Sequence, residues 1–327
     1  MISCQMRAER WEMIEPFEIS REVITHQPVL LLSLDDGQGH TGWAEAAGVD
    51  YEGETPDTMA MQITALLPHL HDDIDHTTLA RLLPAGGARN ALDCALWDLR
   101  AKQGGVPVWQ AAGLAPLKPV TTAFTIGLGD EATTRRKARE ARAYPLLKLK
   151  VDAQRHLDVV RMVHEEHPHA RLVVDANQSW SLALLRELLP QLALAGVEMV
   201  EQPLAKGTDA LLDGLQSPLP LAADESCTDR SSLAHLHGRY QFINIKLDKC
   251  GGLSEGLAMA DQATQMGMGL MVGNMCGTSL AMAPAFLLAQ RCSYIDLDGP
   301  LLQKLDRATP LHYRQGVIDP PSPALWG

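Results

Sequence analysis

The chain has 327 residues, of which 46% are hydrophobic, a composition typical of a globular protein with a sizeable core. Its formal net charge of -12 argues against a nucleic-acid or anionic-membrane partner, because binding such polyanions needs basic patches. Residues 1–10 are mixed and polar, unlike a signal segment, and no apolar run approaches the length of a membrane span. The six cysteines are scattered without zinc-type spacing, so we expect free thiols in a cytoplasmic protein.

The first third of the chain predicts an α+β unit. Two strand-like runs, 28–34 and 40–45, flank Asp35-Asp-Gly-Gln-Gly39, which is rich in residues that tolerate the positive φ of a hairpin turn. The clearest helix runs from Ala88 to Gly104, where apolar residues recur at i, i+3, i+4 and i+7.

From about residue 118, short apolar strands alternate with amphipathic helices. Such βα repeats imply parallel strands, and a count of eight favours an α/β barrel over an open doubly wound sheet. The tail from about 310 is strand-like again, and we expect it to return to the first unit. The eight predicted strands are 120–125, 145–152, 171–175, 197–201, 219–224, 241–246, 270–273 and 294–296.

The strand from Pro145 to Asp152 is unusual because it carries two lysines. Side chains two apart on a strand share a face, so Lys148 and Lys150 point the same way. An unpaired interior ammonium is disfavoured by lost hydration. The segment is therefore either an edge strand with a solvated face or one wall of a charged site.

Charged residues end five consecutive strands. Lys150, Asp175, Glu201, Asp224 and Lys246 follow one another at spacings of 25, 26, 23 and 22 residues, each about one βα repeat. The carboxyl ends of parallel barrel strands meet at the catalytic face. A single carboxylate there could be a helix N-cap, but five charges in register predict one cavity with amines on both sides of the carboxylates.

Three clustered carboxylates cannot all stay ionised in a confined site without a cation. An oxygen-only ligand set suits Mg²⁺, or Mn²⁺ as an alternative, rather than zinc. Such an ion can stabilise the ene-diolate formed when a proton leaves the carbon beside a substrate carboxylate, and a lysine of lowered pKa can remove that proton. Lysines on both faces permit removal from one side and return from the other, which inverts the stereocentre.

At these residues the chain resembles the enolase superfamily. The resemblance covers nearly the whole chain and implies a modified (β/α)7β TIM-type barrel at 118–309. It also implies an α+β capping domain formed by 1–117, to which the tail at 310–327 returns. The motifs are Lys148-Leu-Lys150, Val174-Asp-Ala-Asn177, Glu201-Gln-Pro203, Ala223-Asp-Glu225, Asn244-Ile-Lys-Leu-Asp-Lys249 with Gly251-Gly252, and residues 88–99.

Within that superfamily the chain is most similar to the dipeptide epimerases of the L-Ala-D/L-Glu type, which act on a small dipeptide, some from cell-wall turnover. The similarity rests on Asp296-Leu-Asp298-Gly-Pro300 after the last barrel strand. In that group, two aspartates at this spacing bind the free α-ammonium of a dipeptide. The alternative is that Asp298-Gly-Pro300 is only a turn.

The resemblance also implies roles for single residues. Lys150 and Lys246 would be the acid/base pair, and Lys148 would support the substrate carboxylate and tune Lys150. Asp248 would orient Lys246, with a solvated loop position as the alternative. The other implied assignments are the Mg²⁺ ligands Asp175, Glu201 and Asp224, and the pocket-lining residues Thr125 and Asn274.

The cap loop at 18–25 is expected to close over the substrate side chain. Relatives specific for glutamate carry an arginine where this chain has Ile24, although Arg21 remains. A carboxylate that enters an apolar site without a cation is heavily penalised. The second residue of the dipeptide therefore stays open between glutamate and a hydrophobic or other residue.

Two other functions remain open at this point. The same scaffold could serve an o-succinylbenzoate synthase, an N-acylamino acid racemase or a muconate-type cycloisomerase, whose substrates have no free ammonium for the two aspartates. A metal-stabilised barrel that only binds a peptide or an acid is the other alternative, although binding would not need both lysines. The sequence also leaves a homo-oligomer open.

Overall fold

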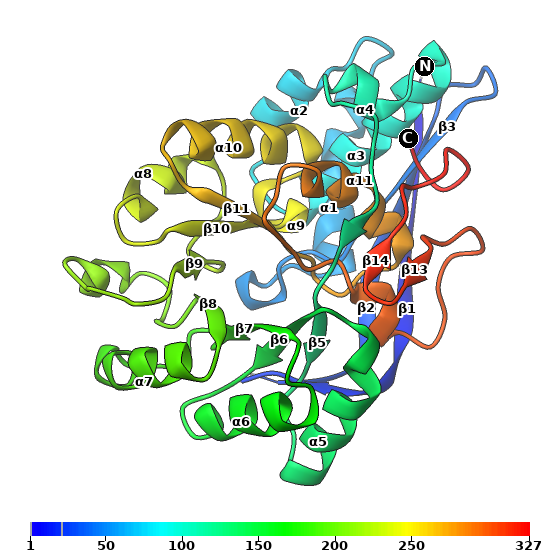
Figure 1. Cartoon of the computed structure of the whole chain (residues 1–327). Helices are drawn as coiled ribbons and strands as arrows, with labels where there is room; N and C mark the ends of the chain where they lie inside the picture. Colours follow the sequence, from blue (N-terminus) through cyan, green and yellow to red (C-terminus); the bar gives the residue numbers. More distant parts are fainter. Residues whose placement is uncertain (1, 21) are drawn as a thin grey trace.

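The computed structural model describes residues 2–20 and 22–327. A curled sheet of parallel strands forms the centre of the molecule, and helices lie around its outside (Figure 1). A separate antiparallel sheet, drawn in blue, runs along one side of this barrel (Figure 1). The chain is therefore an α/β barrel with a capping unit, as predicted.

The cap is built on a three-stranded antiparallel sheet in the order β1-β2-β3. Helix α3 packs against β2 and β3. Gly42 allows this close approach, because a Cβ there would lie 2.2 Å from the carbonyl oxygen of Ala95. The predicted hairpin joins β2 to β3, and the bounds of the cap elements are β1 (Ser3–Glu18), β2 (Val23–Asp35), β3 (Thr41–Ala46), α1 (Pro56–Leu66), α2 (His76–Leu82), α3 (Gly87–Gly104) and α4 (Val108–Ala111).

The barrel sheet contains eight parallel strands that follow one another in chain order. A backbone hydrogen bond of 2.7 Å from Ala123 N–H to the carbonyl of Ile295 links its two edges. The predicted eight-stranded barrel is confirmed. Its strands are β5 (Phe124–Ile126), β6 (Leu146–Lys150), β7 (Arg171–Asp175), β8 (Val197–Glu201), β9 (Leu221–Ala223), β10 (Phe242–Ile245), β11 (Gly269–Val272) and β12 (Tyr294–Ile295).

Helices connect most of these strands, as predicted. The connection from β8 to β9 differs, since it forms only a 3-10 turn at Asp209–Leu212. Residues 202–220 contain three prolines and two glycines, which oppose a longer helix. The connecting helices are α5 (Glu131–Glu140), α6 (Leu157–Glu166), α7 (Leu182–Leu194), α8 (Leu233–Leu236), α9 (Leu247–Cys250), α10 (Leu253–Gln265) and α11 (Ser279–Ala289).

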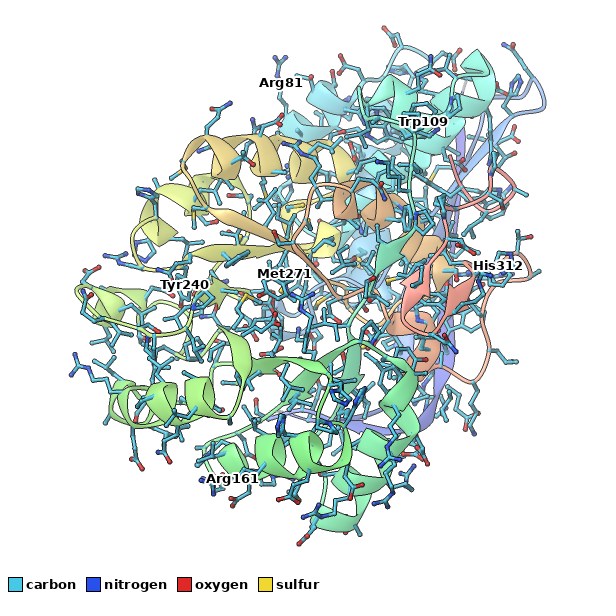
Figure 2. The ribbon with its side chains drawn as sticks, viewed as in Figure 1. Arg81, Trp109, Arg161, Tyr240, Met271 and His312 are labelled. Atoms are coloured by element: carbon cyan, nitrogen blue, oxygen red, sulfur yellow. The ribbon has the colours of Figure 1, made fainter. Side chains whose placement is uncertain are left out.

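Inward-facing side chains fill the barrel in layers, because alternate residues of a strand share a face. The layer nearer the amino-terminal ends of the strands is a buried apolar cluster. Figure 2 shows one of its members, Met271, near the centre of the molecule. Two residues further along each strand, most of the side chains are polar. The apolar layer is Ala123, Leu146, Val173, Met199, Ala222, Met271 and Tyr294, and the next is Thr125, Lys148, Asp175, Glu201, Asp224, Gly273 and Asp296.

The carboxyl-terminal tail touches both parts of the molecule. Its hairpin, β13 (Tyr313–Arg314) and β14 (Val317–Ile318), pairs with β4 (Val120–Thr121) at the start of the barrel segment. Trp326 then packs into the cap and donates a 3.1 Å hydrogen bond to the carbonyl of Cys94 in α3. The exact domain boundaries at 117/118 and 309/310 remain predictions.

All six cysteines are free thiols, which confirms the prediction of a chain without disulfides. Each helix in the described part of the chain is too short or too polar to traverse a bilayer. Neither a disulfide framework nor a helical membrane anchor within residues 2–20 and 22–327 therefore contributes to this fold.

Candidate active site

Strand register brings the predicted charges together. Lys150 of β6 lies opposite Asp175 of β7, which in turn lies opposite Glu201 of β8. Asp224 directly follows β9 on the next strand of the sheet. One carboxylate oxygen from each of the three acids lies within 4.8 Å of the others, and all three residues are buried. The predicted carboxylate cluster is therefore present.

In each of these carboxylates, one oxygen, here called the outer oxygen, accepts a hydrogen bond from a neighbouring group. The three donors differ in kind, since one is a peptide N–H, one a carboxamide and one an ammonium. They are Asn177 N–H to Asp175 Oδ1 at 2.9 Å, Asn244 Nδ2 to Glu201 Oε1 at 2.8 Å, and Lys249 Nζ to Asp224 Oδ1 at 2.6 Å.

Lys148 lies at the centre of the acidic cluster. Its ammonium is 2.8 Å from Glu201 Oε2, 3.1 Å from Asp175 Oδ2 and 2.9 Å from Asp296 Oδ2. Burial by itself lowers the pKa of Lys148, but Asp296, Glu201 and Asp175 outweigh it and hold the pKa well above its usual value. Lys148 is therefore charged, and its charge offsets the cluster.

Lys150 and Lys246 contact the two ends of the same cluster. Lys150 Nζ is 2.7 Å from Asp175 Oδ2, and Lys246 Nζ is 2.8 Å from Asp224 Oδ2. Their strands, β6 and β10, are separated by three strands of the barrel. The two amines therefore approach from opposite sides of the carboxylates, as the sequence predicted.

Burial opposes ionisation of the carboxyl groups in the cluster. It raises the pKa of Glu201 to about 7, helped by the negative charge of Asp175. Burial also opposes ionisation of Asp224, but Lys246 and Lys249 hold the pKa of that carboxyl well below its usual range. The site thus favours further positive charge near Glu201.

The donor set fits a hard divalent cation. Three buried carboxylates each have an oxygen pointing to a common centre, and no histidine or cysteine belongs to this cluster among the described residues. Oxygen ligands of this kind suit Mg²⁺ or Mn²⁺ rather than zinc. Asp175, Glu201 and Asp224 could therefore hold such an ion.

A cavity of about 510 Å³ lies between the barrel and the cap. Lys150 and Lys246 line its barrel end, with Asn177 and Asn274 beside them. The cap contributes residues from two segments, 17–28 and 47–56. The cavity is large enough for a dipeptide-sized molecule, and both lysines reach it.

Ile24 lies in the cap wall of this cavity. It packs against a small apolar cluster of Met13, Phe17 and Ile19, with Cys276 at its edge. Ile24 belongs to strand β2 rather than to a loop, and its place in the cavity wall makes the predicted contact with the substrate side chain geometrically available. Arg21, from the segment predicted as a loop, lies outside the described residues.

Asp296 and Asp298 are both buried after β12. Asp296 pairs with Lys148, while Asp298 Oδ2 accepts a 2.7 Å hydrogen bond from Thr125 N–H. Burial and the charge of Asp296 raise the pKa of Asp298 to about 7. Asp298 also precedes a 3-10 turn, Gly299–Leu302, so the turn and the paired acids are both present.

Thr125 and Asn274 support this corner of the site. Thr125 Oγ1 donates to Asp296 Oδ1 at 3.4 Å. Asn274 donates to the carbonyl of Asp296 at 2.7 Å and accepts from Cys276 N–H at 2.6 Å. Asn274 lines the cavity, and its side chain also orders the loop that follows β11.

Asp248 does not occupy a solvated loop, which had been one of its two predicted positions. It is 7% exposed and accepts hydrogen bonds from Gly48 N–H at 3.0 Å and Asn90 Nδ2 at 3.2 Å. Burial raises its pKa to about 7. Its hydrogen bonds tie the barrel to the cap loop that lines the cavity.

Sequence reasoning missed several cavity residues. Asn177 and Glu225 line the barrel end, and both lie in motifs that had been recognised without a role for these two residues. Asp50 and Tyr51 line the cap end, in a short 3-10 helix (Asp50–Glu52) whose sequence carries no periodic signal. Only the folded chain brings these segments together.

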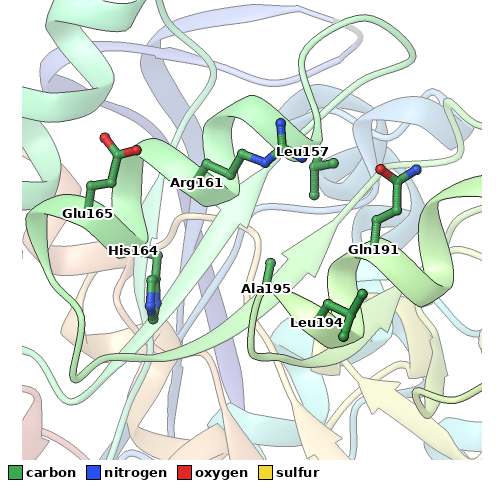
Figure 3. Close-up of a pocket in the computed structure, with 7 residues that line it drawn as sticks. All are labelled: Leu157, Arg161, His164, Glu165, Gln191, Leu194 and Ala195. Atoms are coloured by element: carbon green, nitrogen blue, oxygen red, sulfur yellow. The ribbon is translucent and has the colours of Figure 1, made fainter.

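A second hollow, of about 360 Å³, lies on the outside of the barrel between α6 and α7 (Figure 3). Figure 3 shows the residues that line it, with Arg161, His164 and Glu165 on α6 and Gln191 and Leu194 on α7. The candidate catalytic residues do not line this hollow, so we do not assign the chemistry there.

Two family models match the chain. The mandelate racemase/muconate lactonizing enzyme N-terminal domain matches residues 1–113, and the enolase C-terminal domain-like model matches residues 130–324. Together they cover most of the sequence. The chain belongs to the enolase superfamily.

Relatives with similar sequences indicate a group within the superfamily. The chain is 40% identical over 288 residues to an N-acetyl-D-glutamate racemase from a Pseudoalteromonas species, covering 88% of this chain and 91% of that protein. It is 39% identical over 314 residues to the L-Ala-D/L-Glu epimerase of Escherichia coli K12, covering 95% and 97%. The predicted enzyme class, an isomerase of the racemase and epimerase group, is confirmed at the level of these relatives.

Solved structures lead to the same classification as the curated relatives. An Agrobacterium tumefaciens enolase family member with homology to dipeptide epimerases, with bound sodium and L-Ala-L-Glu, has a TM-score of 0.96 at 39% identity over the full length of both chains. A dipeptide epimerase from Methylococcus capsulatus, complexed with Mg and L-Arg-D-Lys, has a TM-score of 0.90 at 29% identity, covering 99% of this chain and 98% of that one. The fold is that of dipeptide epimerases.

Proposed function

We propose that this protein is a Mg²⁺-dependent dipeptide epimerase, of the L-Ala-D/L-Glu type or acting on a related dipeptide. It would work by 1,1-proton transfer between Lys150 and Lys246. The observation that carries the proposal is that these two amines line one cavity from opposite sides of the carboxylate cluster. The epimerases among its relatives, with dipeptides bound in their structures, support the same reaction class.

The chain's own residues would divide the reaction between them. One lysine would remove the α-proton of the carboxyl-terminal residue, and the other would return a proton to the opposite face. Asp175, Glu201 and Asp224 would hold Mg²⁺. The bound ion would supply positive charge that offsets the negative charge gained by the substrate carboxylate as the proton leaves.

Asp298 and Asp296 would receive the free ammonium of the dipeptide. Asp296 is already paired with Lys148, whereas Asp298 accepts one backbone N–H. A buried carboxylate gains most from a charged donor, so the ammonium would favour Asp298. Lys148 would remain beside the cluster and keep Asp296 neutralised.

A second candidate function is racemisation of an N-acylated amino acid. The relative named N-acetyl-D-glutamate racemase favours it, as do the internal partners that Asp296 and Asp298 already have. N-acetylglutamate has the same acidic α-carbon beside a carboxylate but no free ammonium. The two functions therefore differ at the aspartate pair rather than at the lysines.

Proton exchange in D₂O tests both functions. The enzyme is incubated with Mg²⁺ and a panel of L-Ala-L-Glu, L-Ala-L-Leu, other dipeptides and N-acetyl-D-glutamate, and products are read by mass spectrometry and chiral chromatography. We expect one deuteron per molecule and inversion for a dipeptide. Exchange of N-acetylglutamate alone would support the second function, and no exchange by any compound would contradict both.

A further inference from the structure

Lys249 is a buried lysine that the proposed reaction does not use. Lys249 is 4% exposed and lies three residues after Lys246, near the end of the short helix α9. Lys246 lines the substrate cavity, whereas Lys249 lines a separate hollow on the other side of the 49–54 cap loop. The two lysines therefore reach Asp224 from different sides.

The Lys249 ammonium donates three hydrogen bonds within the protein. It donates to Asp224 Oδ1 at 2.6 Å, to the carbonyl of Asp224, and to the carbonyl of Asn244 at 3.1 Å. An ammonium has three N–H donors, so each one has a buried acceptor. Turning this group toward the substrate would break all three of these hydrogen bonds.

Asp224 differs from the other two carboxylates in the charge of its outer donor. Asp175 has a peptide N–H there and Glu201 a carboxamide, whereas Asp224 has the Lys249 ammonium. The hydrogen bond at Asp224 Oδ1 is therefore also an ion pair, whereas the donors at Asp175 and Glu201 are neutral groups. Asp224 Oδ2 pairs with the acid/base candidate Lys246, as Asp175 Oδ2 pairs with Lys150, so a fixed Oδ1 determines where Oδ2 lies.

We propose that Lys249 is a positioning residue that holds Asp224 through Oδ1, so that Oδ2 alone faces the metal site and Lys246. The proposal rests on the proposed function only in taking Asp224 as a metal ligand. Outer partners that orient a ligand typically change metal affinity or activity by about 10–100-fold when they are removed. Lys249 would thus make Asp224 a monodentate ligand of fixed direction.

The cap in turn holds the helix that carries Lys249. Arg89 of α3 donates to the carbonyls of Cys250 at 2.5 Å and Gly251 at 3.2 Å, just where α9 ends. Gly251 has φ of 85°, and a Cβ there would lie 2.2 Å from Arg89 Nε. The position of Lys249 therefore depends on this contact between the cap and the barrel.

Calorimetric titration with Mg²⁺, without any substrate, tests the proposal. Lys249→Met removes the ammonium and keeps the apolar stem, and we expect Mg²⁺ affinity about 10–100-fold weaker than in the parent. Lys206→Met is the matched control, because Lys206 lines the same hollow but its ammonium pairs with the exposed Glu52 rather than with Asp224. A folded Lys249→Met protein, judged by circular dichroism, with parent-like affinity would overturn the proposal.

A crystal structure of the parent protein with Mg²⁺ tests the same point without a substitution. We expect Asp224 to bind the ion through Oδ2 while Oδ1 stays on Lys249. A bidentate Asp224, an Asp224 outside the coordination sphere, or a Lys249 turned away from it would overturn the proposal even if Lys249→Met does not fold. Weakened Mg²⁺ binding in the variant without turnover of any dipeptide by the parent would contradict the proposed function and leave this inference standing.

Discussion

The two ends of the substrate cavity are built in different ways. The barrel end presents Lys150 and Lys246 from regularly spaced strands, above a buried apolar layer whose members come from different strands of the barrel. The cap end gathers Ile24 from strand β2 and Asp50 and Tyr51 from a short 3-10 helix, without a common period. In the proposed enzyme, the reaction chemistry would come from a repeated framework, and contacts to the substrate side chain would come from irregular segments.

We expect the barrel end and the cap end of the cavity to have separate functions. Substitutions at the barrel end should change the rate with every substrate, because every substrate presents the same α-carbon. Substitutions at the cap end should change which side chain is accepted and leave proton transfer intact. Asp248 lies where the two ends meet and should affect stability instead.

The largest effect is expected from the barrel lysines. Lys150→Met and Lys246→Met should each lower epimerisation by about 10²–10⁴-fold, because each removes one partner of a general acid–base pair. Chiral chromatography with both epimers measures the loss. Lys206→Met, which changes an exposed lysine, should keep the parent rate. A parent-like rate in either lysine variant would break the assignment of chemistry to the barrel end.

Asp298→Asn should have the next largest effect, and it should depend on the substrate. The change keeps an oxygen for Thr125 N–H but removes the negative charge that a dipeptide ammonium would meet. Losing one partner of a buried charge pair costs about 2–5 kcal/mol, so kcat/KM for a dipeptide should fall at least about 30-fold. N-acetylglutamate, measured in parallel, should be much less affected. Equal losses with both substrates would argue against an ammonium site.

Ile24→Arg tests the cap end. A cation in this wall should lower KM for L-Ala-L-Glu by about tenfold, because it would pair with the γ-carboxylate, and should raise KM for L-Ala-L-Leu. Steady-state kinetics with both dipeptides measures the switch. Ile14→Arg is the control, since Ile14 is exposed on β1 and does not line the cavity. If KM changed in the same direction for both dipeptides, Ile24 would not determine substrate specificity.

The smallest effect is a pH dependence at Asp248. Burial raises the pKa of Asp248 in the folded state to about 7, above the ordinary aspartate value of 3.8. Its stabilising contribution is therefore full below the unfolded pKa and is lost as pH rises through about 7. Asp248→Asn cannot ionise, so its Tm at pH 8 should exceed the parent's by on the order of 5 °C, with little difference at pH 4. Asp73→Asn, at an exposed site, should change neither value.

Sequence reasoning succeeded where a local pattern repeats. The eight strands and the charges at their ends were predicted because alternation and βα spacing are properties of neighbouring residues. Strand β1 was missed, because most of its side chains are at least partly exposed and several are charged. Its place is set by pairing with β2 along nearly its whole length, which is a tertiary property.

The sequence by itself determined the barrel and its lysine and carboxylate ladder, because both follow from periodic spacing along one chain, and its motifs indicated the superfamily by resemblance. The tertiary structure decided which oxygen of each carboxylate faces the site, that Asp248 is buried under the cap, and that Lys249 stands behind Asp224. These facts depend on side chains from segments far apart in the sequence. Their directions are set by packing and hydrogen bonding between those segments, which no local pattern records.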